Sequence, residues 1–379
     1  MDTRVEGSTT ALVWRNREGE EVRARLLDVL NSRRQLPVVP PEIFPAEHHN
    51  RPYLQQEASF VNPQVLALCP NAEGSCRQNT EELDEEDLVL RVEAGEQGNI
   101  PFLVIRPKLL NSTKVVLRRP VVICLHSTGN SKETMRPFMR AYASLGYVAV
   151  GMDARNHGDR GRSPHAYANA LVAAWKTGQE MPFLFDTVWD LIKLIDYLTG
   201  RPDIDPQRIG MMGISLGGMH TWFAAAADRR IAAAVSLIGV QSFGWAIAHD
   251  QWHARVASIP QPFEAAAQDL GKNEVDTDTV AAVWQRLAPG LMDFLDSPHT
   301  VPAIAPRPLL VHNGEDDPRC PIEGLAEVVF RTAERYKEAG ALEHFKFLAE
   351  EGLGHTVTAA MGDEAITWFN KHLRPESTV

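Results

Sequence analysis

From Asp87 onward, mostly apolar runs of five to ten residues alternate with stretches that have helical spacing. An apolar run without alternation is typical of a strand buried on both faces, and helices between such strands indicate a parallel sheet covered on both sides. The predicted strands are residues 88–94, 100–107, 120–126, 147–153, 208–214, 231–240, 308–312 and 344–348, and the predicted helices are residues 131–145, 185–198, 323–338 and 363–371. The sequence therefore predicts an α/β fold with a mostly parallel central sheet and helices on both faces.

Two segments stand outside this alternation. Residues 1–85 contain one short helical pattern, at residues 21–31, followed by a proline cluster that ends a helix, and an acidic run at 81–87 that we interpret as a solvated entry to the first strand. Residues 241–304 are rich in aromatic side chains and lie between two predicted strands. We expect an N-terminal helical or irregular extension (1–85) and a main domain (86–379) with a helical cap insertion (241–304), placed where open α/β sheets bind ligands.

Charge and composition exclude several classes of partner. The chain of 379 residues has a net charge of −11 and no basic cluster, so we expect it to bind no nucleic acid. Its apolar runs are too short to span a bilayer and its first residues lack an apolar leader, which predicts a cytoplasmic protein without membrane contact. Four cysteines without a Cys-x-x-Cys pair give no zinc signature, and we predict no metal and no cofactor. The oligomeric state stays open.

The string GISLGG, residues 213–218, places Ser215 between a predicted strand and an alanine-rich helical run. This context is that of a nucleophile elbow, in which glycines let strand and helix approach closely. A serine needs a base, and the base needs an orienting acid. NGEDDP offers Asp316 or Asp317 after a later strand, and GLGH offers His355 after the last strand, so the order serine, acid, histidine is met.

The pattern Gly314-x-x-Asp317-x-x-x-Pro321 resembles the segment that carries the acid in α/β-hydrolases, which favours Asp317 over Asp316. HSTGNSKE, DARNHGDRG and RPDIDPQRIGMMGISLGG match the same superfamily in order, so the chain from about Leu88 onward resembles its dienelactone hydrolase-like and acetyl xylan esterase-like branch, with prolyl oligopeptidase-type domains as neighbours. The resemblance implies an α/β-hydrolase fold and a serine esterase that forms an acyl-enzyme with Ser215, Asp317 and His355.

The same resemblance implies that the backbone N–H groups of Thr128 and Leu216 bind the oxyanion. The segment here is His126-Ser127-Thr128-Gly129 where the family usually has His-Gly-x-Gly, so Ser127 replaces a glycine. In DARNHGDRG, Asp153, His157 and Arg160 are expected mainly to shape the loop beside the active site.

Candidate substrate-binding residues come from the loop after the predicted strand 120–126 and from the cap. They are His126, Ser127, Phe243, Trp245 and Trp252, and the aromatic members predict an apolar group in a small-molecule ester. Two alternatives to this interpretation stay open. His126 would instead anchor its loop by hydrogen bonds. The string HDQWH, residues 249–253, would put two histidines on one helix face as in zinc sites, although no third ligand is evident.

Three rival functions share the predicted fold. A serine aminopeptidase and a thioesterase would use the same residues, and a ligand receptor with the hydrolase fold would turn over little substrate. A complete serine, acid and histidine set argues against the receptor.

Overall fold

The computed structural model describes residues 6–34, 41–46, 82–108 and 117–373, with side chains of the first helix described from Glu18 onward. In these ranges nine strands form one sheet in the order β1-β2-β3-β5-β4-β6-β7-β8-β9. The strands are β1 (Glu42–Pro45), β2 (Leu83–Arg91), β3 (Asn99–Pro107), β4 (Arg119–Leu125), β5 (Val148–Met152), β6 (Ile204–Ile214), β7 (Ile231–Leu237), β8 (Leu309–Gly314) and β9 (Phe345–Glu350). Strands β4 to β9 pair in parallel, and β1, β2 and β3 pair antiparallel, which confirms the predicted mostly parallel sheet.

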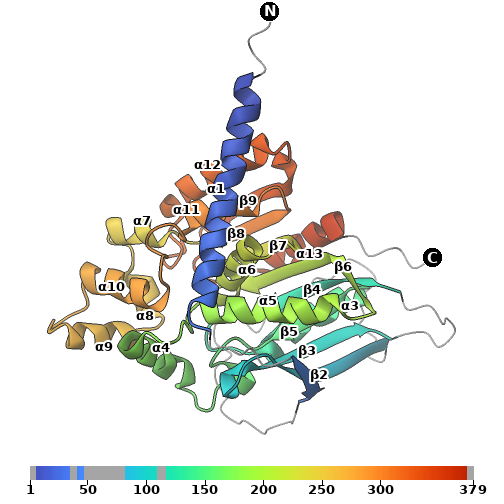
Figure 1. Ribbon diagram of the computed structural model, residues 1–379, viewed down its shortest axis with the longest axis horizontal. Coiled ribbons are helices and arrows are strands. Elements are labelled where there is room, and N and C mark those ends of the chain that lie inside the picture. The colour runs from blue at the N-terminus through green and yellow to red at the C-terminus, as the bar shows by residue number, and fades with distance from the viewer. Residues whose placement is uncertain (1–5, 35–40, 47–81, 109–116, 374–379) are drawn as a thin grey trace, which may run out of the picture.

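Helices cover both faces of this sheet (Figure 1). They are α1 (Glu6–Asn31), α3 (Arg136–Ser144), α4 (Ala166–Thr177), α5 (Phe185–Thr199), α6 (Leu216–Ala227), α7 (Phe243–Ala248), α8 (His253–Ala257), α9 (Gln261–Asp269), α10 (Thr277–Leu287), α11 (Ser297–Thr300), α12 (Ala326–Glu338) and α13 (Ala359–Leu373), with short 3₁₀ turns η3 (Glu96–Gly98), η4 (Lys132–Met135), η5 (Gly158–Arg160), η6 (Pro302–Ile304), η7 (Ile322–Leu325) and η8 (Leu342–His344). None of them, in the ranges described, has both the length and the apolar character needed to cross a bilayer.

Strand β4 shows how the sheet separates two cores. Val121 and Ile123 belong to the core with α5, α6 and α12, while Val122 and Cys124 belong to the core with α3 and α13. Successive side chains of a strand point to opposite faces of the sheet. A strand such as β4, with an apolar residue at every position, therefore contributes side chains to both cores.

Helix α1 is longer than the pattern at residues 21–31 predicted. It contacts α5, α6, α11 and η6, and its N-terminal part extends beyond the body (Figure 1). Val22, Leu26 and Leu30 are buried in this contact. Apolar residues at helical spacing occur only in the turns that pack on the body, so the sequence pattern predicted a helix shorter than the observed one.

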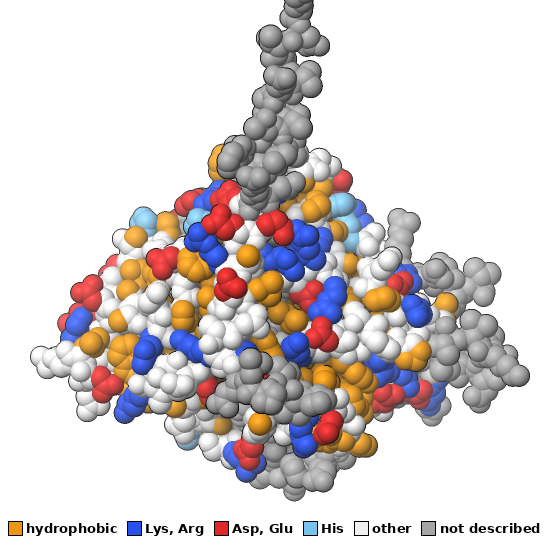
Figure 2. All heavy atoms as spheres, in the orientation of Figure 1, with side chains coloured by type: hydrophobic (Ala, Val, Ile, Leu, Met, Phe, Trp, Pro, Cys, Tyr) orange, Lys and Arg blue, Asp and Glu red, His pale blue; other side chains and the backbone are white. Residues whose placement is uncertain are grey.

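The acidic run also differs from its interpretation as a solvated entry. Strand β2 begins at Leu83, so Asp84 to Asp87 lie within it, and carboxylates of this part pair with basic side chains of neighbouring elements, whereas Glu81 lies outside the described residues. Glu85 pairs with Arg136 and Arg140, and Glu86 with Arg106. These carboxylates therefore form ion pairs with side chains of neighbouring elements instead of pointing only to solvent. Adjacency in the sequence does not reveal such ion pairs. On the face shown in Figure 2, acidic and basic side chains are likewise interspersed.

Residues 241–304 contain α7 to α11 and η6 between β7 and β8. Helices α9 and α10 pack against α4, a helix that the sequence analysis did not predict (Figure 1). The predicted cap region therefore adjoins α4, which lies between β5 and α5 in the chain.

Candidate active site

Ser215 lies at the turn between β6 and α6. Its φ of 53° and ψ of −110° are unusual for a residue with a side chain, and its N–H donates to the Leu237 carbonyl at 2.9 Å. Glycines make this turn possible. A Cβ on Gly213 would lie 2.2 Å from the Gly217 carbonyl, and one on Gly217 would lie 2.3 Å from the Leu125 carbonyl oxygen. The backbone is thus packed so closely that the side chain of Ser215 is held at the end of the strand.

Three side chains from separate loops form a hydrogen-bonded chain at this point. The Ser215 hydroxyl lies 2.9 Å from Nε2 of His355, and Nδ1 of His355 lies 2.7 Å from Oδ2 of Asp317. The other oxygen of Asp317 accepts the backbone N–H of Arg319 at 2.8 Å. Asp316 is exposed and does not take part. Such a chain lets an imidazole accept a serine proton while the carboxylate stabilises the resulting cation.

Burial and charge set the protonation of this group. Burial lowers the pKa of His355 below its ordinary value of 6.5, although the hydrogen bond and charge of Asp317 oppose the change. Burial would raise the pKa of Asp317, but the hydrogen bond and charge of His355 and the N–H of Arg319 outweigh it and keep the pKa low. At neutral pH the pair is therefore a neutral imidazole beside a carboxylate, as a general base requires.

A cavity of about 20 Å³ lies beside Ser215, with room for about one water molecule. Its lining residues are Ser127, Thr128, Ile214, Ser215, Ile238, Ser258, Arg319 and His355. Leu216 is the first residue of α6, where N–H groups lack partners within the helix and the helix dipole is positive. Asn130 holds the facing loop, because its amide donates to the Ser127 hydroxyl at 2.8 Å and to the Thr128 carbonyl at 3.3 Å.

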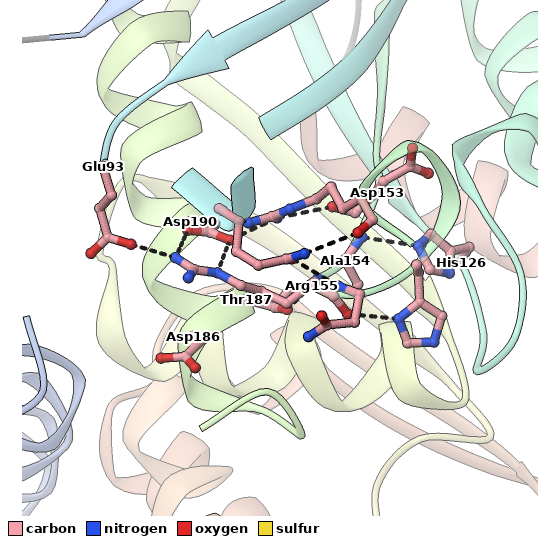
Figure 3. Close-up of polar contacts among 12 residues, drawn as sticks. Glu93, His126, Asp153, Ala154, Arg155, Asp186, Thr187 and Asp190 are labelled. Carbon is pink, nitrogen blue, oxygen red and sulfur yellow. Dashed lines mark hydrogen bonds and ion pairs between the residues drawn. The ribbon is translucent and has the colours of Figure 1, made fainter. Parts of the chain in front are cut away.

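The loop after β4 is also tied to the loop after β5. His126 is buried, accepts the N–H of Ala154 at Nε2 (3.0 Å) and donates from Nδ1 to the Ser127 carbonyl (2.9 Å), so it anchors its own loop away from the cavity. Asp153 accepts the N–H of Lys132 at 2.7 Å. Figure 3 shows Ala154 directed at His126, with Asp153 beside it. The carbonyl of Ser127 is thus fixed through a neighbouring loop.

A buried ionic cluster continues from this loop to α5 and α1. Arg155 binds both oxygens of Asp190 at 2.8 and 2.7 Å, and Arg160 lies 2.8 Å from the same carboxylate. Arg155 also reaches Glu93 at 2.7 Å, as the dashed lines in Figure 3 show. Arg34, just after α1, lies 2.8 Å from Asp186 and 3.2 Å from Glu93. Arg155 and Arg160 therefore shape the loop from within instead of entering the cavity.

The aromatic cap residues are placed elsewhere than expected. Phe243 is buried against Trp284, with ring centroids 5.3 Å apart, and Trp252 stacks on His253. Trp245 packs against Gly324 and His249. Among the described residues they do not line the cavity at Ser215, because the cap uses its large rings as its own core. Their role in substrate binding stays a prediction, and Ser258 is the cap residue that lines the cavity.

The histidines of HDQWH do not share a helix face. Helix α7 ends at Ala248 and α8 begins at His253, with Asp250 between them in the left-handed region at φ 57°. Nδ1 of His249 and of His253 each hydrogen-bond a backbone carbonyl, at 2.9 and 3.2 Å. The expected shared face is therefore wrong, since the chain turns between the two rings.

One group of potential metal ligands exists in the described residues, at Asp317, Cys320 and His355. The first and last already hydrogen-bond each other. Burial raises the pKa of the Cys320 thiol, so it stays protonated and is a poor metal ligand. Cys124 is a second buried free thiol, and Cys69 and Cys76 lie outside the described residues.

Comparison with known proteins places this geometry in a family. The model of the alpha/beta hydrolase family matches residues 122–369, about two thirds of the chain. The chain belongs to the alpha/beta hydrolase family. As a member, it places Ser215, Asp317 and His355 in the loops after β6, β8 and β9, all at the carboxyl edge of the sheet.

Individual relatives are distant. "Putative hydrolase YtaP" of Bacillus subtilis (strain 168) is 24% identical over 310 residues, covering 78% of this chain and 90% of YtaP. Esterase YjfP of Escherichia coli (strain K12) is 24% identical over 285 residues, covering 75% of this chain and 100% of YjfP. Acetyl xylan esterase 1 from Thermoanaerobacterium sp. JW/SL YS485 superposes with a TM-score of 0.56 at 18% identity, covering 93% of each chain, which shows a shared fold.

Several cavity residues escaped the sequence analysis. Arg319 follows Asp317 by two positions within NGEDDPRCP, so the motif itself could have suggested it. Ser258 and Ile238 carry no local signal, because only the folding of the cap and the turn after β7 brings them to Ser215.

Proposed function

We propose that this protein is a serine esterase that hydrolyses carboxylic esters through an acyl-enzyme. The proposal is supported above all by the hydrogen-bonded chain from Ser215 to His355 to Asp317. Ser215 attacks the ester carbonyl while His355 takes its proton, and His355 returns that proton to the departing alcohol. Water then attacks the acyl-enzyme with His355 again as base, which releases the acid and restores the serine.

The N–H groups of Thr128 and Leu216 would hold the oxyanion in both steps. Thr128 lines the cavity and Leu216 begins α6, so each lies directly beside the reacting serine in space or in sequence. Donors already aimed at the developing charge stabilise the transition state without reorganisation. The hydrogen bonds from Asn130 and His126 would keep the first of these loops in position.

The small cavity favours a short acyl group. A space of about 20 Å³ leaves no room for a long acyl chain without rearrangement. YjfP and the acetyl xylan esterase, which are named as esterases, agree with ester chemistry. We therefore expect acetate esters to be hydrolysed faster than decanoate esters; the apolar group predicted from the cap aromatics stays a separate prediction.

Probe labelling combined with a substrate screen tests this function. A fluorophosphonate should label the wild-type protein and fail to label Ser215→Ala, whose fold is checked by circular dichroism. In the same assays, p-nitrophenyl acetate should be hydrolysed only by the wild type. Undiminished labelling of folded Ser215→Ala would contradict the proposed nucleophile.

The same substrate screen distinguishes the rival activities. Faster cleavage of aminoacyl-arylamides would indicate a peptidase, and faster cleavage of acetyl thioesters would indicate a thioesterase. Tight retention of a small ligand with negligible turnover would indicate a receptor.

A further inference from the structure

Ile238, the first residue after β7, has a backbone conformation that isoleucine rarely adopts. Its φ is 45°, in the left-handed region, where a β-branched side chain is strained. Two contacts hold the backbone there, because its N–H donates to the His312 carbonyl at 2.8 Å and its carbonyl accepts from the Cys320 thiol at 3.5 Å. Strain that the surroundings maintain in this way is concentrated at functional sites.

The left-handed turn changes the face of the sheet to which Ile238 belongs. Along β7, the side chains of Ala233, Val235 and Leu237 belong to the core with α3 and α13, as alternation along a strand requires. Continued alternation would place the next side chain on the face that carries α6. Ile238 instead belongs to the same core as Leu237, so two consecutive side chains share one face.

The close approach of α6 explains this change of face. A Cβ on Gly239 would lie 2.6 Å from the Cα of Gly218 in α6, and a Cβ on Gly218 would lie 2.9 Å from the hydroxyl oxygen of Ser236. Backbone and side chains are therefore packed so tightly on the α6 face that a large side chain has no room there. The isoleucine side chain is accommodated on the opposite face.

On that face, Ile238 lies beside the reacting serine. It lines the cavity of about 20 Å³ together with Ser215 and His355, and it is only 2% exposed. Ser215 donates its N–H to the carbonyl of Leu237, directly before Ile238, at 2.9 Å. Ile214 lines the same cavity and belongs to the same core. The strained residue thus forms part of an apolar wall next to the serine hydroxyl.

We propose that Ile238 limits the length of the acyl group that this site accepts. The inference rests on the proposed esterase function and names the residue that sets its acyl specificity. Glycine would adopt the same φ without strain, so the side chain itself is what isoleucine adds at this position. Truncating this side chain would free space next to Ser215 for the additional methylene groups of a longer acyl chain.

Esters that differ only in acyl length measure this limit. The pair is p-nitrophenyl acetate and p-nitrophenyl butyrate, which share the leaving group. The butyrate-to-acetate ratio of kcat/KM should rise at least about fivefold in Ile238→Ala and in Ile238→Gly, since one methylene in an apolar pocket changes kcat/KM about tenfold or more. Glycine also relieves the backbone strain, so Ile238→Gly is the variant to measure if Ile238→Ala does not fold.

Two controls distinguish a specific wall from a general loosening of the site. Ile259→Ala makes the same truncation at a buried isoleucine of the cap that is not among the described residues lining the cavity, and it should leave the ratio unchanged. In the Ile238 variants, the kcat/KM ratio of 4-methylumbelliferyl acetate to p-nitrophenyl acetate should also stay constant, because these esters differ only in the alcohol part. A comparable shift in this leaving-group ratio would overturn the inference.

Alkylboronic acids supply a readout that does not depend on turnover. Their boron binds the oxygen of a nucleophilic serine, and the alkyl group stands where the acyl chain of an ester would lie. The measured quantity is the concentration that gives half protection from fluorophosphonate labelling. The ratio of this concentration for propylboronic acid to that for methylboronic acid should fall at least about fivefold in the Ile238 variants.

The two assays separate this inference from the proposed function. Ratios that stay unchanged in both assays would overturn the role of Ile238 and leave the esterase function standing. A shifted boronic acid ratio without hydrolysis of any ester would support the role of Ile238 and count against the esterase function alone.

Discussion

At the scale of single residues, His355 is subject to two opposed effects. Burial disfavours its cation, while Asp317 at 2.7 Å favours it, and burial prevails. The base is consequently neutral, and able to accept a proton, at a lower pH than a free histidine would be.

The pH dependence of kcat/KM tests this balance. Because the pKa of His355 is lowered from 6.5, kcat/KM for p-nitrophenyl acetate should rise with pH to a midpoint below 6.5 and be level at pH 7. Asp317→Asn should reduce kcat on the order of 10,000-fold, since the imidazole loses its orienting acceptor. A wild-type midpoint above pH 6.5 would show that burial does not dominate.

At the scale of elements, the elbow depends on how closely β6, α6 and β4 approach one another. Gly217 lies against the carbonyl of Leu125 at the end of β4. The strained backbone of Ser215 persists because these contacts leave the turn no other conformation.

Gly217→Ala should therefore destabilise the whole domain. The new Cβ would lie 2.3 Å from the Leu125 oxygen, and since this atom belongs to the backbone, the strand or the helix must move. We expect a loss of at least about 2 kcal/mol in the free energy of urea unfolding. Gly19→Ala on α1 is the control: its nearest contact would be an ordinary 3.7 Å, so it should be neutral or gain up to about 1 kcal/mol. Similar unfolding midpoints for the two variants would refute the close-packing argument.

At the scale of the whole molecule, the cluster around Asp190 joins parts that are distant in sequence. Three cations, Arg34, Arg155 and Arg160, meet three anions, Glu93, Asp186 and Asp190, contributed by the end of α1, the loops after β2 and β5, and α5. The cluster supports the loop that holds His126 and so lies behind the candidate active site (Figure 3).

Asp190→Asn should be among the most damaging polar substitutions. It would remove the carboxylate that Arg160 binds and leave Arg155 with Glu93, and breaking a buried pair in this way costs about 3–5 kcal/mol. The free energy of urea unfolding measures the loss. Glu96→Gln, which removes an exposed pair with Arg162, should cost less than about 1 kcal/mol. If both variants unfolded at the same urea concentration, the cluster would be structurally unimportant.

The parts predicted from sequence are those with a local pattern. Continuous apolar runs located the parallel strands, and GISLGG indicated the turn at Ser215, since each pattern reflects contacts within a few residues. No such pattern predicted the full length of α1 or the presence of α4, because apolar residues recur at helical spacing only where a helix packs against another element.

By itself, the sequence determined the fold class and the order in which a serine, an acid and a histidine follow the strands. Only the tertiary structure showed that Asp317, which the family pattern favoured over Asp316, contacts His355, that the cap aromatics fill the cap, and that Arg319 lines the cavity beside Ser215. The reason is physical: periodicity reports which face of an element is buried, whereas contacts between side chains 38 and 140 positions apart depend on how whole elements pack.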